Sequence, residues 1–300
     1  MQDSHPDFLL TTIDAVRARV RDWRHQGLRV GMVPTMGTLH EGHLALVDRS
    51  RARTNRTLAT IFLNPTQFGP DEDFEAYPRT FEQDLKNLAA RGCDVVFAPS
   101  VAELFPDGFR TMDEFRTRVT VHGLSEPLCG AFREGHFAAV ATQVMKLFMI
   151  GLPDVAFFGE KDYQQLQVVR RMVRDLNVPV EIEAVPTVRD SDGLALSSRN
   201  AYLTAEERAI APWVYRVLCE AVGELRAGGA PGAVTEAARR ILIEKGFASV
   251  DYVTLVDAET LQTLDRADNP ARLLAAARLG KARLIDNVPF VPGDAAAGER

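Results

Sequence analysis

The sequence predicts an α/β fold, a doubly wound parallel sheet with helices on both faces, followed by a smaller α+β C-terminal domain. Over the first two thirds of the chain, short apolar runs alternate with segments of helical periodicity, which is the pattern of repeated βαβ units. The runs are rich in Val, Leu and Phe and lack strict alternation with polar residues, as expected for strands buried on both faces. This pattern changes after about Thr187. We therefore expect two domains, 1–187 and 188–300.

The first domain contains five expected strands in its main sheet, at 28–34, 58–63, 94–98, 154–158 and 180–185. A further strand is expected in a side excursion at 117–122. Helices are expected at 41–54, 78–91, 136–150 and 163–176. Thr80 and Gln83 have the spacing of a capping box at the start of the second of these helices. Sheets of this kind bind ligands at the carboxyl ends of their strands, so the loops after strands are the first places to look for a site.

The second domain begins with another capping box, Thr204 with Glu207, which predicts a long helix toward Ala227. A turn at 228–232 (GGAPG) separates it from a second helix that runs to about residue 245. Strands are expected at 250–256 and 282–285, on either side of an Ala/Leu/Arg-rich segment at 271–279.

The composition argues against several function classes. The 300 residues include 35 Lys and Arg against 41 Asp and Glu, for a net charge of −6, and there is no long basic run. Nucleic acids and membrane surfaces are therefore not expected as partners. The three cysteines form no CxxC pair, which argues against disulfides or a zinc site and predicts a cytoplasmic location. The most apolar window, 137–152, is interrupted by polar residues and is interpreted as a buried helix rather than a membrane span.

The most specific segment is PTMGTLHEGHL, residues 34–44, directly after the first expected strand. Gly37 permits a tight turn, and the helix that follows begins with His40 and His43. These histidines are neighbours on a helix surface. A helix N-terminus offers backbone N–H groups and a positive dipole end to a phosphate, and two imidazoles there can hold negative charge. The spacing also permits a metal site, but no third ligand is evident nearby.

Two later segments also carry groups suited to phosphate. Lys161 lies in GEKD, residues 159–162, after the strand expected at 154–158, and it supplies a point charge for phosphate oxygens. The alternative is a solvated surface lysine. Ser197, Ser198 and Arg199 combine two hydroxyl groups with a guanidinium, a set that matches a triphosphate or pyrophosphate. The alternative is a pair of helix-capping serines.

These segments resemble a known family. Residues 34–44 are similar to the HxGH signature of the nucleotidylyltransferase superfamily, which includes the class I aminoacyl-tRNA synthetases. IFLNPTQF at 61–68, GEKDYQQL at 159–166 and DGLALSSRN at 192–200 stand in the order found in the pantothenate synthetase (pantoate–β-alanine ligase) family. The resemblance extends over residues 10–290.

The resemblance implies a Rossmann-like first domain and an AMP-forming carbon–nitrogen ligase of pantothenate biosynthesis, in the coenzyme A pathway. Its substrates would be ATP, (R)-pantoate and β-alanine, and pantoyl adenylate would be the intermediate. Because neither step needs a protein nucleophile, catalysis is expected to rest on positioning and charge stabilisation. Mg²⁺ would bridge phosphate oxygens, held mostly by substrate and water, with Asp84 as a further contributor. A homodimer and an active site in the cleft between the two domains are also implied.

The resemblance also assigns roles to individual residues. His43 would be the proton donor, and the other catalytic residues would be His40, Lys161 and Arg199. The implied ATP-binding positions are Met36, Gly37, Thr38, Leu39, His40, Glu41, Gly42, His43, Gly159, Glu160, Lys161, Asp162, Val188, Leu196, Ser197, Ser198 and Arg199. Gln67 and Gln165 would bind pantoate, and Gln67 would also contact β-alanine. From the residues alone, each would be an ordinary surface glutamine.

Two features near these segments leave alternatives open. The acidic loop at 68–77, FGPDEDFEAY, contains Gly and Pro and is either a lid that excludes water or a static surface loop. Glu134 stands where the family usually has proline, so two alternatives stay open for Arg133: it contacts the nucleotide or pyrophosphate, or it does not.

Other functions fit the motifs less well. A cytidylyltransferase-like enzyme would share HxGH but would need additional basic residues for an acceptor phosphate, whereas this chain offers glutamines. An RNA-dependent synthetase is disfavoured by the acidic balance. A nucleotide-binding regulator without chemistry predicts loss of phosphate-handling residues, yet the histidines, Lys161 and the SSR triplet are all present.

Overall fold

The computed structural model describes residues 8–69, 72–108 and 115–292. The chain divides into two compact units. Unit 1 consists of Met1–Glu126, Arg133–Glu160 and Gln165–Pro186. Unit 2 consists of Pro127–Phe132, Lys161–Gln164 and Thr187–Arg300. Two short segments from the earlier part of the chain therefore belong to the C-terminal unit.

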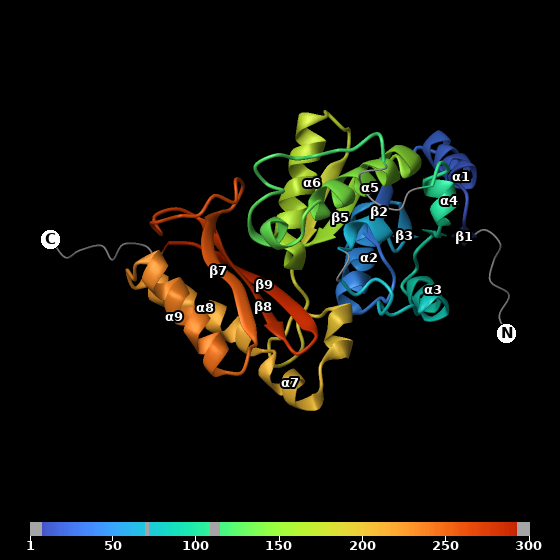
Figure 1. The fold of residues 1–300 in the computed structure, drawn as a ribbon. Helices are drawn as coiled ribbons and strands as arrows, with labels where there is room; N and C mark the ends of the chain where they lie inside the picture. Colours follow the sequence, from blue (N-terminus) through green and yellow to red (C-terminus); the bar gives the residue numbers. More distant parts are fainter. Residues whose placement is uncertain (1–7, 70–71, 109–114, 293–300) are drawn as a thin grey trace. The chain divides into compact units, whose positions relative to one another are not determined.

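Unit 1 is built on a six-stranded parallel sheet with the order β1-β4-β3-β2-β5-β6 (Figure 1). Its strands are β1 Leu9–Leu10, β2 Val30–Thr35, β3 Arg56–Ile61, β4 Val95–Phe97, β5 Val155–Gly159 and β6 Glu181–Val185. Its helices are α1 Ile13–His25, α2 Glu41–Arg53, α3 Phe81–Ala90, α4 Val101–Leu104, α5 His136–Gly151 and α6 Tyr163–Asp175. The predicted α/β class is confirmed. β1 was not expected from the sequence.

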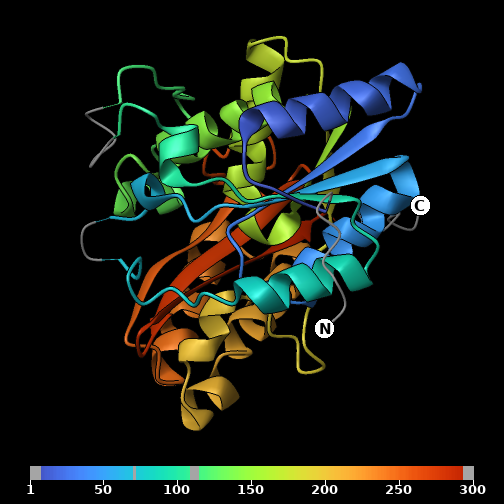
Figure 2. The same ribbon diagram turned by 90° about the vertical axis from the view of Figure 1, so that its right-hand side faces the viewer.

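The helices cover both faces of the sheet. α2 and α3 lie on one face, and α1, α5 and α6 lie on the other (Figure 2). Right-handed crossovers place helices on opposite faces when the chain changes direction across a sheet. Here the chain moves from β2 outward to β3 and β4, and then returns to β5 and β6 on the other side of β2. The strand order therefore reverses between β2 and β5.

The apolar runs become strands because both sides of them are buried. Val33 in β2, Ala59 in β3 and Phe157 in β5 are fully buried in one cluster with Val47 of α2. The apolar window at 137–152 forms α5, in which Phe148 is fully buried. Among the residues that the structure describes, no helix is long and apolar enough to cross a membrane.

Two expectations for unit 1 are wrong. Residues 117–122 form no strand, and the Val119 N–H instead donates to the Thr142 hydroxyl of α5 at 2.9 Å. Thr80 does precede α3, but it makes no capping bond to a backbone N–H. Its hydroxyl donates to the carboxylate of Asp84 at 3.1 Å, so a side-chain acceptor replaces the predicted capping box.

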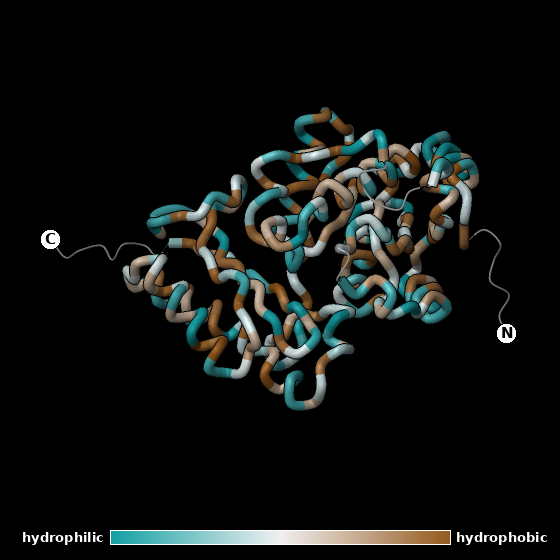
Figure 3. Tube along the Cα trace, viewed as in Figure 1, coloured by the Kyte–Doolittle hydropathy of each residue, from teal (hydrophilic) through white to brown (hydrophobic). Residues whose placement is uncertain are grey.

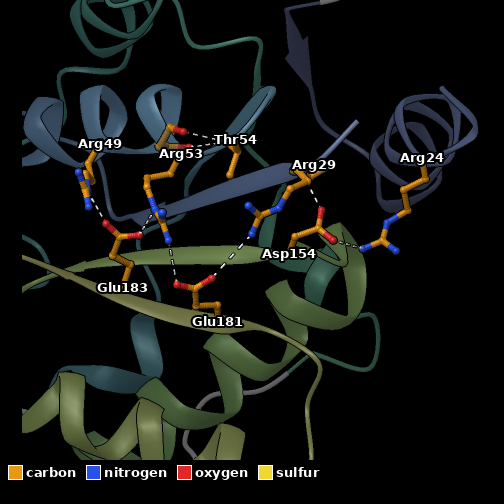
Figure 4. A network of polar contacts seen from close by, with 10 residues as sticks. Arg24, Arg29, Arg49, Arg53, Thr54, Asp154, Glu181 and Glu183 are labelled. Carbon is orange, nitrogen blue, oxygen red and sulfur yellow. Dashed lines mark hydrogen bonds and ion pairs between the residues drawn. The ribbon is translucent and has the colours of Figure 1, made fainter. Parts of the chain in front are cut away.

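A row of ion pairs joins α2, the sheet and α1 (Figure 4). Glu183 accepts from both Arg49 and Arg53, and Arg53 also reaches Glu181 at 3.2 Å. Partial burial opposes ionisation of Glu183, but hydrogen bonds from the two arginines outweigh it and hold the pKa of this carboxyl below its ordinary value. Glu181 and Asp154 stand at the amino ends of β6 and β5, so this end of the network lies at the sheet edge opposite the strands' carboxyl ends.

Unit 2 contains an antiparallel sheet with the order β7-β8-β9. Its elements are α7 Ala205–Ile210, α8 Trp213–Arg226, α9 Pro231–Glu244, β7 Ser249–Asp257, β8 Ala271–Leu279 and β9 Ala282–Phe290. Hydrophobic and hydrophilic positions alternate along α8 and α9 (Figure 3), and their apolar faces share a core with the sheet. This is the predicted α+β arrangement.

The long helix expected from Thr204 toward Ala227 is wrong. The capping box itself is present, since Glu207 N–H donates to Thr204 Oγ1 at 3.2 Å and Thr204 N–H donates to Glu207 Oε2 at 2.8 Å. However, α7 ends at Ile210 and α8 starts at Trp213. Pro212 stands between them, and proline has no N–H to continue the helical hydrogen bonds.

Candidate active site

The predicted site residues of unit 1 lie on segments that follow three adjacent parallel strands. Residues 36–43 follow β2, Gln67 ends a short 3-10 turn after β3, and Gly159 ends β5. Because β3, β2 and β5 are neighbours, their carboxyl ends share one edge of the sheet, where the strand order reverses. This is the position at which such sheets bind ligands.

The turn after β2 has a backbone that favours glycine. Gly37 has φ +88° and Thr38 has φ +54°. A Cβ on Gly37 would lie 3.2 Å from Asp84 Oδ2 and 3.3 Å from Ile61 Cγ2. Glycine adopts positive φ without steric cost, so the chain can turn closely against α3 and β3 before α2 begins.

Asp84 holds this turn through both oxygens of its carboxylate. Oδ2 accepts the Thr38 N–H and Oδ1 accepts the Leu39 N–H, each at 2.8 Å. The side chain is buried. Asp84 is thus a positioning residue for the turn that leads to the histidines. No sequence pattern indicates this role, because Asp84 is 46 residues from Thr38 and 45 residues from Leu39 in the chain.

His40 and His43 cap α2 reciprocally, as Ser and Glu do in an ordinary capping box. His40 Nδ1 accepts the Gly42 N–H at 3.1 Å, and His43 Nδ1 accepts the His40 N–H at 3.4 Å. The ring centroids are 4.1 Å apart. Since each Nδ1 is an acceptor, each neutral ring carries its proton on Nε2. The structure therefore brings two imidazole N–H donors together at the start of α2.

Gln67 is held through its main chain. His136 Nδ1 lies 2.8 Å from the Gln67 carbonyl oxygen, and Arg133 Nη2 donates to the same oxygen at 3.3 Å. Arg133 Nη1 lies 2.9 Å from His136 Nε2. Arginine only donates, so His136 accepts at Nε2 and donates from Nδ1. The Gln67 side chain donates to the thioether of Met36, which joins the segments after β2 and β3.

The loop at 68–77 is fastened to this cluster by Glu72. Its two carboxylate oxygens accept from Arg133 Nε and Nη2, both at 2.6 Å. Partial burial opposes ionisation of Glu72, but the hydrogen bonds and charge of Arg133 outweigh it and hold the pKa of Glu72 below its ordinary value. The Phe68 ring packs against Phe74 and Tyr77. Residues 70 and 71 of this loop lie outside the described residues, and its interpretation as a lid stays a prediction.

Lys161 and Asp162 belong to unit 2, whereas Gly159, Glu160 and Gln165 of the same stretch belong to unit 1. The Lys161 side chain is 20% exposed, and its Nζ lies 3.8 Å from Asp162 Oδ2. The Lys161 side chain is therefore partly buried, and its assignment to phosphate stays a prediction. The Lys161 carbonyl accepts a hydrogen bond at 3.0 Å from the side-chain amide of Asn287 in β9.

The other predicted residues of unit 2 lie on and after a small hairpin, residues 188–196. The Leu196 N–H donates to the Val188 carbonyl at 3.0 Å, and Arg189 pairs with Ala195. Ser197 then caps the 3-10 turn Ser198–Tyr202 by accepting the Arg199 N–H at 3.3 Å. The capping interpretation is thus confirmed for Ser197, and Ser198 is the first residue of the turn.

The described residues contain no group of three His, Cys, Asp or Glu that could hold a metal ion. Both oxygens of Asp84 accept backbone N–H groups.

A sheet switch point beside a histidine-capped helix N-terminus is the arrangement of a nucleotide-binding α/β enzyme. Residues 8–289 match the sequence profile of the family described as Pantoate-beta-alanine ligase. A pantothenate synthetase from Paramagnetospirillum magneticum is 54% identical over 284 residues, which cover 95% of this chain and 98% of the relative. The chain belongs to the pantoate–β-alanine ligase family.

Solved structures agree in fold. A pantothenate synthetase from Thermus thermophilus has a TM-score of 0.86 and 46% identity, over 95% of this chain and 100% of that chain. A pantoate–β-alanine ligase from Francisella tularensis, solved in complex with β-γ ATP and β-alanine, has a TM-score of 0.78 and 31% identity. That comparison covers 94% of this chain and 97% of the other.

Proposed function

We propose that this chain condenses (R)-pantoate with β-alanine to give pantothenate in a reaction driven by ATP. Its family membership supports the overall reaction. The observation that carries the proposal is the histidine-capped start of α2, which lies on the turn after β2 and is linked through Met36 to Gln67. Donors for a phosphate chain and a neutral side chain for a hydroxy acid thus lie on neighbouring segments.

We assign ATP binding to the predicted residues of both units. In unit 1, the N–H groups at the start of α2 and the Nε2–H groups of His40 and His43 donate to phosphate oxygens. In unit 2, Lys161 and the Ser197–Arg199 segment supply an ammonium, two hydroxyls and a guanidinium. His43 is assigned as the proton donor. The other positions assigned to ATP binding are Met36, Gly37, Thr38, Leu39, Glu41, Gly42, Gly159, Glu160, Asp162, Val188 and Leu196.

Pantoate is assigned to Gln67 and Gln165, and β-alanine to Gln67. A carboxamide both donates and accepts, so it suits the hydroxyl and carboxylate groups of a hydroxy acid without adding charge. The main chain of Gln67 is fixed by Arg133 and His136, which places its side chain in a defined position beside Met36. Gln165 lies in the first turn of α6 and is half-buried.

The chemistry follows in two steps. A pantoate carboxylate oxygen attacks the α-phosphorus of ATP, and the bond to pyrophosphate breaks, which leaves pantoyl adenylate. The β-alanine amine then attacks the acyl carbon and expels AMP, and the amine loses a proton to water. His40, His43, Lys161 and Arg199 stabilise the charge on the transferring and leaving phosphates. Mg²⁺ is proposed to enter with the phosphates of ATP. A homodimer and a cytoplasmic location are proposed from the family resemblance alone.

The test is an assay with ATP, Mg²⁺, pantoate and β-alanine, in which each component is omitted in turn. Pantothenate should form only in the complete mixture. Pantoate with ATP and Mg²⁺ but without β-alanine should release one pyrophosphate per active site. A positional isotope label in the pantoate carboxylate should appear in AMP, because the adenylate transfers that oxygen. Release of ADP, or an unlabelled AMP, would contradict the adenylate route.

A further inference from the structure

Asn287 of β9 fixes the main chain of Lys161. Its side chain is buried; Nδ2 donates to the Lys161 carbonyl at 3.0 Å, while Oδ1 accepts from Arg272 Nε at 2.6 Å. Because arginine only donates, the oxygen of the amide must face Arg272 and its NH₂ must face Lys161. The Arg272 guanidinium also lies 4.3 Å from the ring centroid of Tyr163, so the same pair of strands holds the residues on both sides of Asp162.

Asp286, the preceding residue, holds the hairpin at 188–196. Its buried carboxylate accepts from Arg189 Nη1 at 2.5 Å and from Nη2 at 2.8 Å. Arg189 Nη1 also donates to the Gly193 carbonyl at 3.1 Å. Burial alone would lower the pKa of Arg189, but the hydrogen bonds and charge of Asp286 raise it above its ordinary value. The hairpin is therefore folded around a charged side chain that β9 anchors.

Tyr215 of α8 closes the other side of this hairpin. The Arg189 guanidinium lies 3.7 Å from the centroid of the Tyr215 ring. Gly193 has φ +96°, and a Cβ there would lie 2.6 Å from Tyr215 Cδ1, so only glycine fits the tip of the hairpin at this distance.

Asn287, which holds Lys161, and Asp286, which holds the hairpin, are neighbouring residues of β9. Consecutive strand residues point to opposite faces of a sheet, so Asp286 and Asn287 reach different partners from one place in the strand. Asp286 Oδ1 also accepts the Asn287 N–H at 2.7 Å. One short segment of β9 thus contacts both the Lys161 main chain and the hairpin that leads into Ser197–Arg199.

We infer that Asp286 and Asn287 are positioning residues that place Lys161 and the Ser197–Arg199 segment for phosphate chemistry. The inference rests on the proposed function, because those groups act on ATP there. Charge stabilisation depends on the placement of the donor, and a misplacement of about 1 Å costs roughly 100-fold in rate. Neither Asp286 nor Asn287 needs to touch a substrate for this effect.

The first test is Asn287→Asp. A carboxylate can still accept from Arg272 but cannot donate to the Lys161 carbonyl. The matched control is Asp251→Asn, which weakens another buried pair of the same sheet, Asp251 with Arg283 at 2.7 Å. Single-turnover pyrophosphate release should slow by about 10- to 100-fold in N287D and keep the wild-type rate in D251N, at comparable melting temperatures. Equal adenylation rates in the two variants would overturn the inference.

A double-mutant cycle with Lys161→Ala separates positioning from general destabilisation. If Asn287 acts through Lys161, N287D should have little further effect on the adenylation rate of K161A, whereas independent effects would multiply. Multiplying effects would overturn the assignment for Asn287. Should N287D fail to fold, Arg189→Lys keeps the charge beside Asp286 but loses the two-pronged contact, and it should slow adenylation with little change in β-alanine attack. A wild-type rate in R189K would equally count against the inference.

Amide hydrogen exchange provides a readout that does not depend on activity. N287D should raise exchange over 161–164 and R189K over 188–199, each relative to D251N. Unchanged protection in both variants would contradict the inference even in an active enzyme. Conversely, a wild-type protein that releases no pyrophosphate from ATP and pantoate would overturn the proposed function, while the exchange data would still report on the two anchors.

Discussion

Glu72 and Arg133 form a two-pronged ion pair, with Arg133 Nε and Nη2 each 2.6 Å from a different oxygen of the Glu72 carboxylate. The pair joins the loop after Gln67 to the segment that precedes the start of α5. Arg133 also bonds the Gln67 carbonyl. The acidic loop and the proposed pantoate-binding residue are therefore held by the same guanidinium.

The Glu72→Gln substitution should abolish the part of the protein's acid-pH dependence of stability that comes from the Glu72–Arg133 ion pair. The pKa of Glu72 is lowered in the folded protein from its ordinary value of 4.5, so the ion pair stabilises the fold above that pH and its contribution is lost as the pH falls through the folded pKa. At neutral pH, E72Q should lower the free energy of unfolding by about 1 kcal/mol. Melting curves across pH, with the exposed Glu82→Gln as control, check this. If the melting temperatures of wild type and E72Q change in parallel down to strongly acid pH, the Glu72–Arg133 ion pair does not contribute as expected.

Asp84→Asn should impair both stability and adenylation. An asparagine has one acceptor oxygen for the two N–H groups of Thr38 and Leu39, so one buried donor loses its partner at a cost of about 1–3 kcal/mol. The turn before His40 should then shift and slow pyrophosphate release. Asp94→Asn is the control, because Asp94 accepts the Thr57 N–H at 2.8 Å at the opposite edge of the sheet. If D84N is less stable than wild type but adenylates at the same rate as D94N, Asp84 has no part in the site.

His43→Ala should lower the adenylation rate by about 10²- to 10³-fold, as expected on removal of one charge-stabilising donor. The substitution also removes the acceptor of the His40 N–H. His43→Asn retains a capping acceptor but does not reproduce the imidazole Nε2–H, so it should be similarly slow while melting closer to wild type. His25→Ala, at the exposed end of α1, serves as the control. Wild-type turnover in either His43 variant would remove the proposed role.

Gln67→Ala should raise the KM for pantoate and leave the KM for ATP nearly unchanged. The loop should stay in place, because Arg133 and His136 contact the Gln67 main chain and not its side chain. Steady-state kinetics with each substrate varied in turn, compared with the exposed Gln83→Ala, would measure the split. Equal losses in affinity for both substrates would contradict the assignment.

The fold was predictable where apolar runs and periodicity agree. The buried strands β2, β3 and β5 and the helix α5 follow from this agreement. β8 does not, because Ala271–Leu279 is rich in good helix formers. It becomes the central strand because β7 and β9 pair with both of its edges, and tertiary pairing overrides local propensity.

Candidate site residues could be proposed from the sequence only where they are neighbours in the chain. HxGH, GEKD and SSR are contiguous segments, and their position after strands or at a turn follows from the local pattern. The residues that hold them are distant, since Asn287 is 126 residues from Lys161 and Arg133 is 66 residues from Gln67. Spacing in one sequence gives no signal for such partners. Thr80 differs, because its partner Asp84 is only four residues away. The same Asp84 oxygen also accepts the Leu39 N–H, which is 45 residues away and gives no signal in the sequence.

The hydrogen bond from Asn287 to the Lys161 carbonyl can form only after residue 287 has been synthesised. When residues 1–250 have been synthesised, every strand of the parallel sheet is present. Asn287, which anchors the Lys161 main chain, is still missing. The Lys161 main chain therefore gains this anchor only late in translation, once β9 has been synthesised.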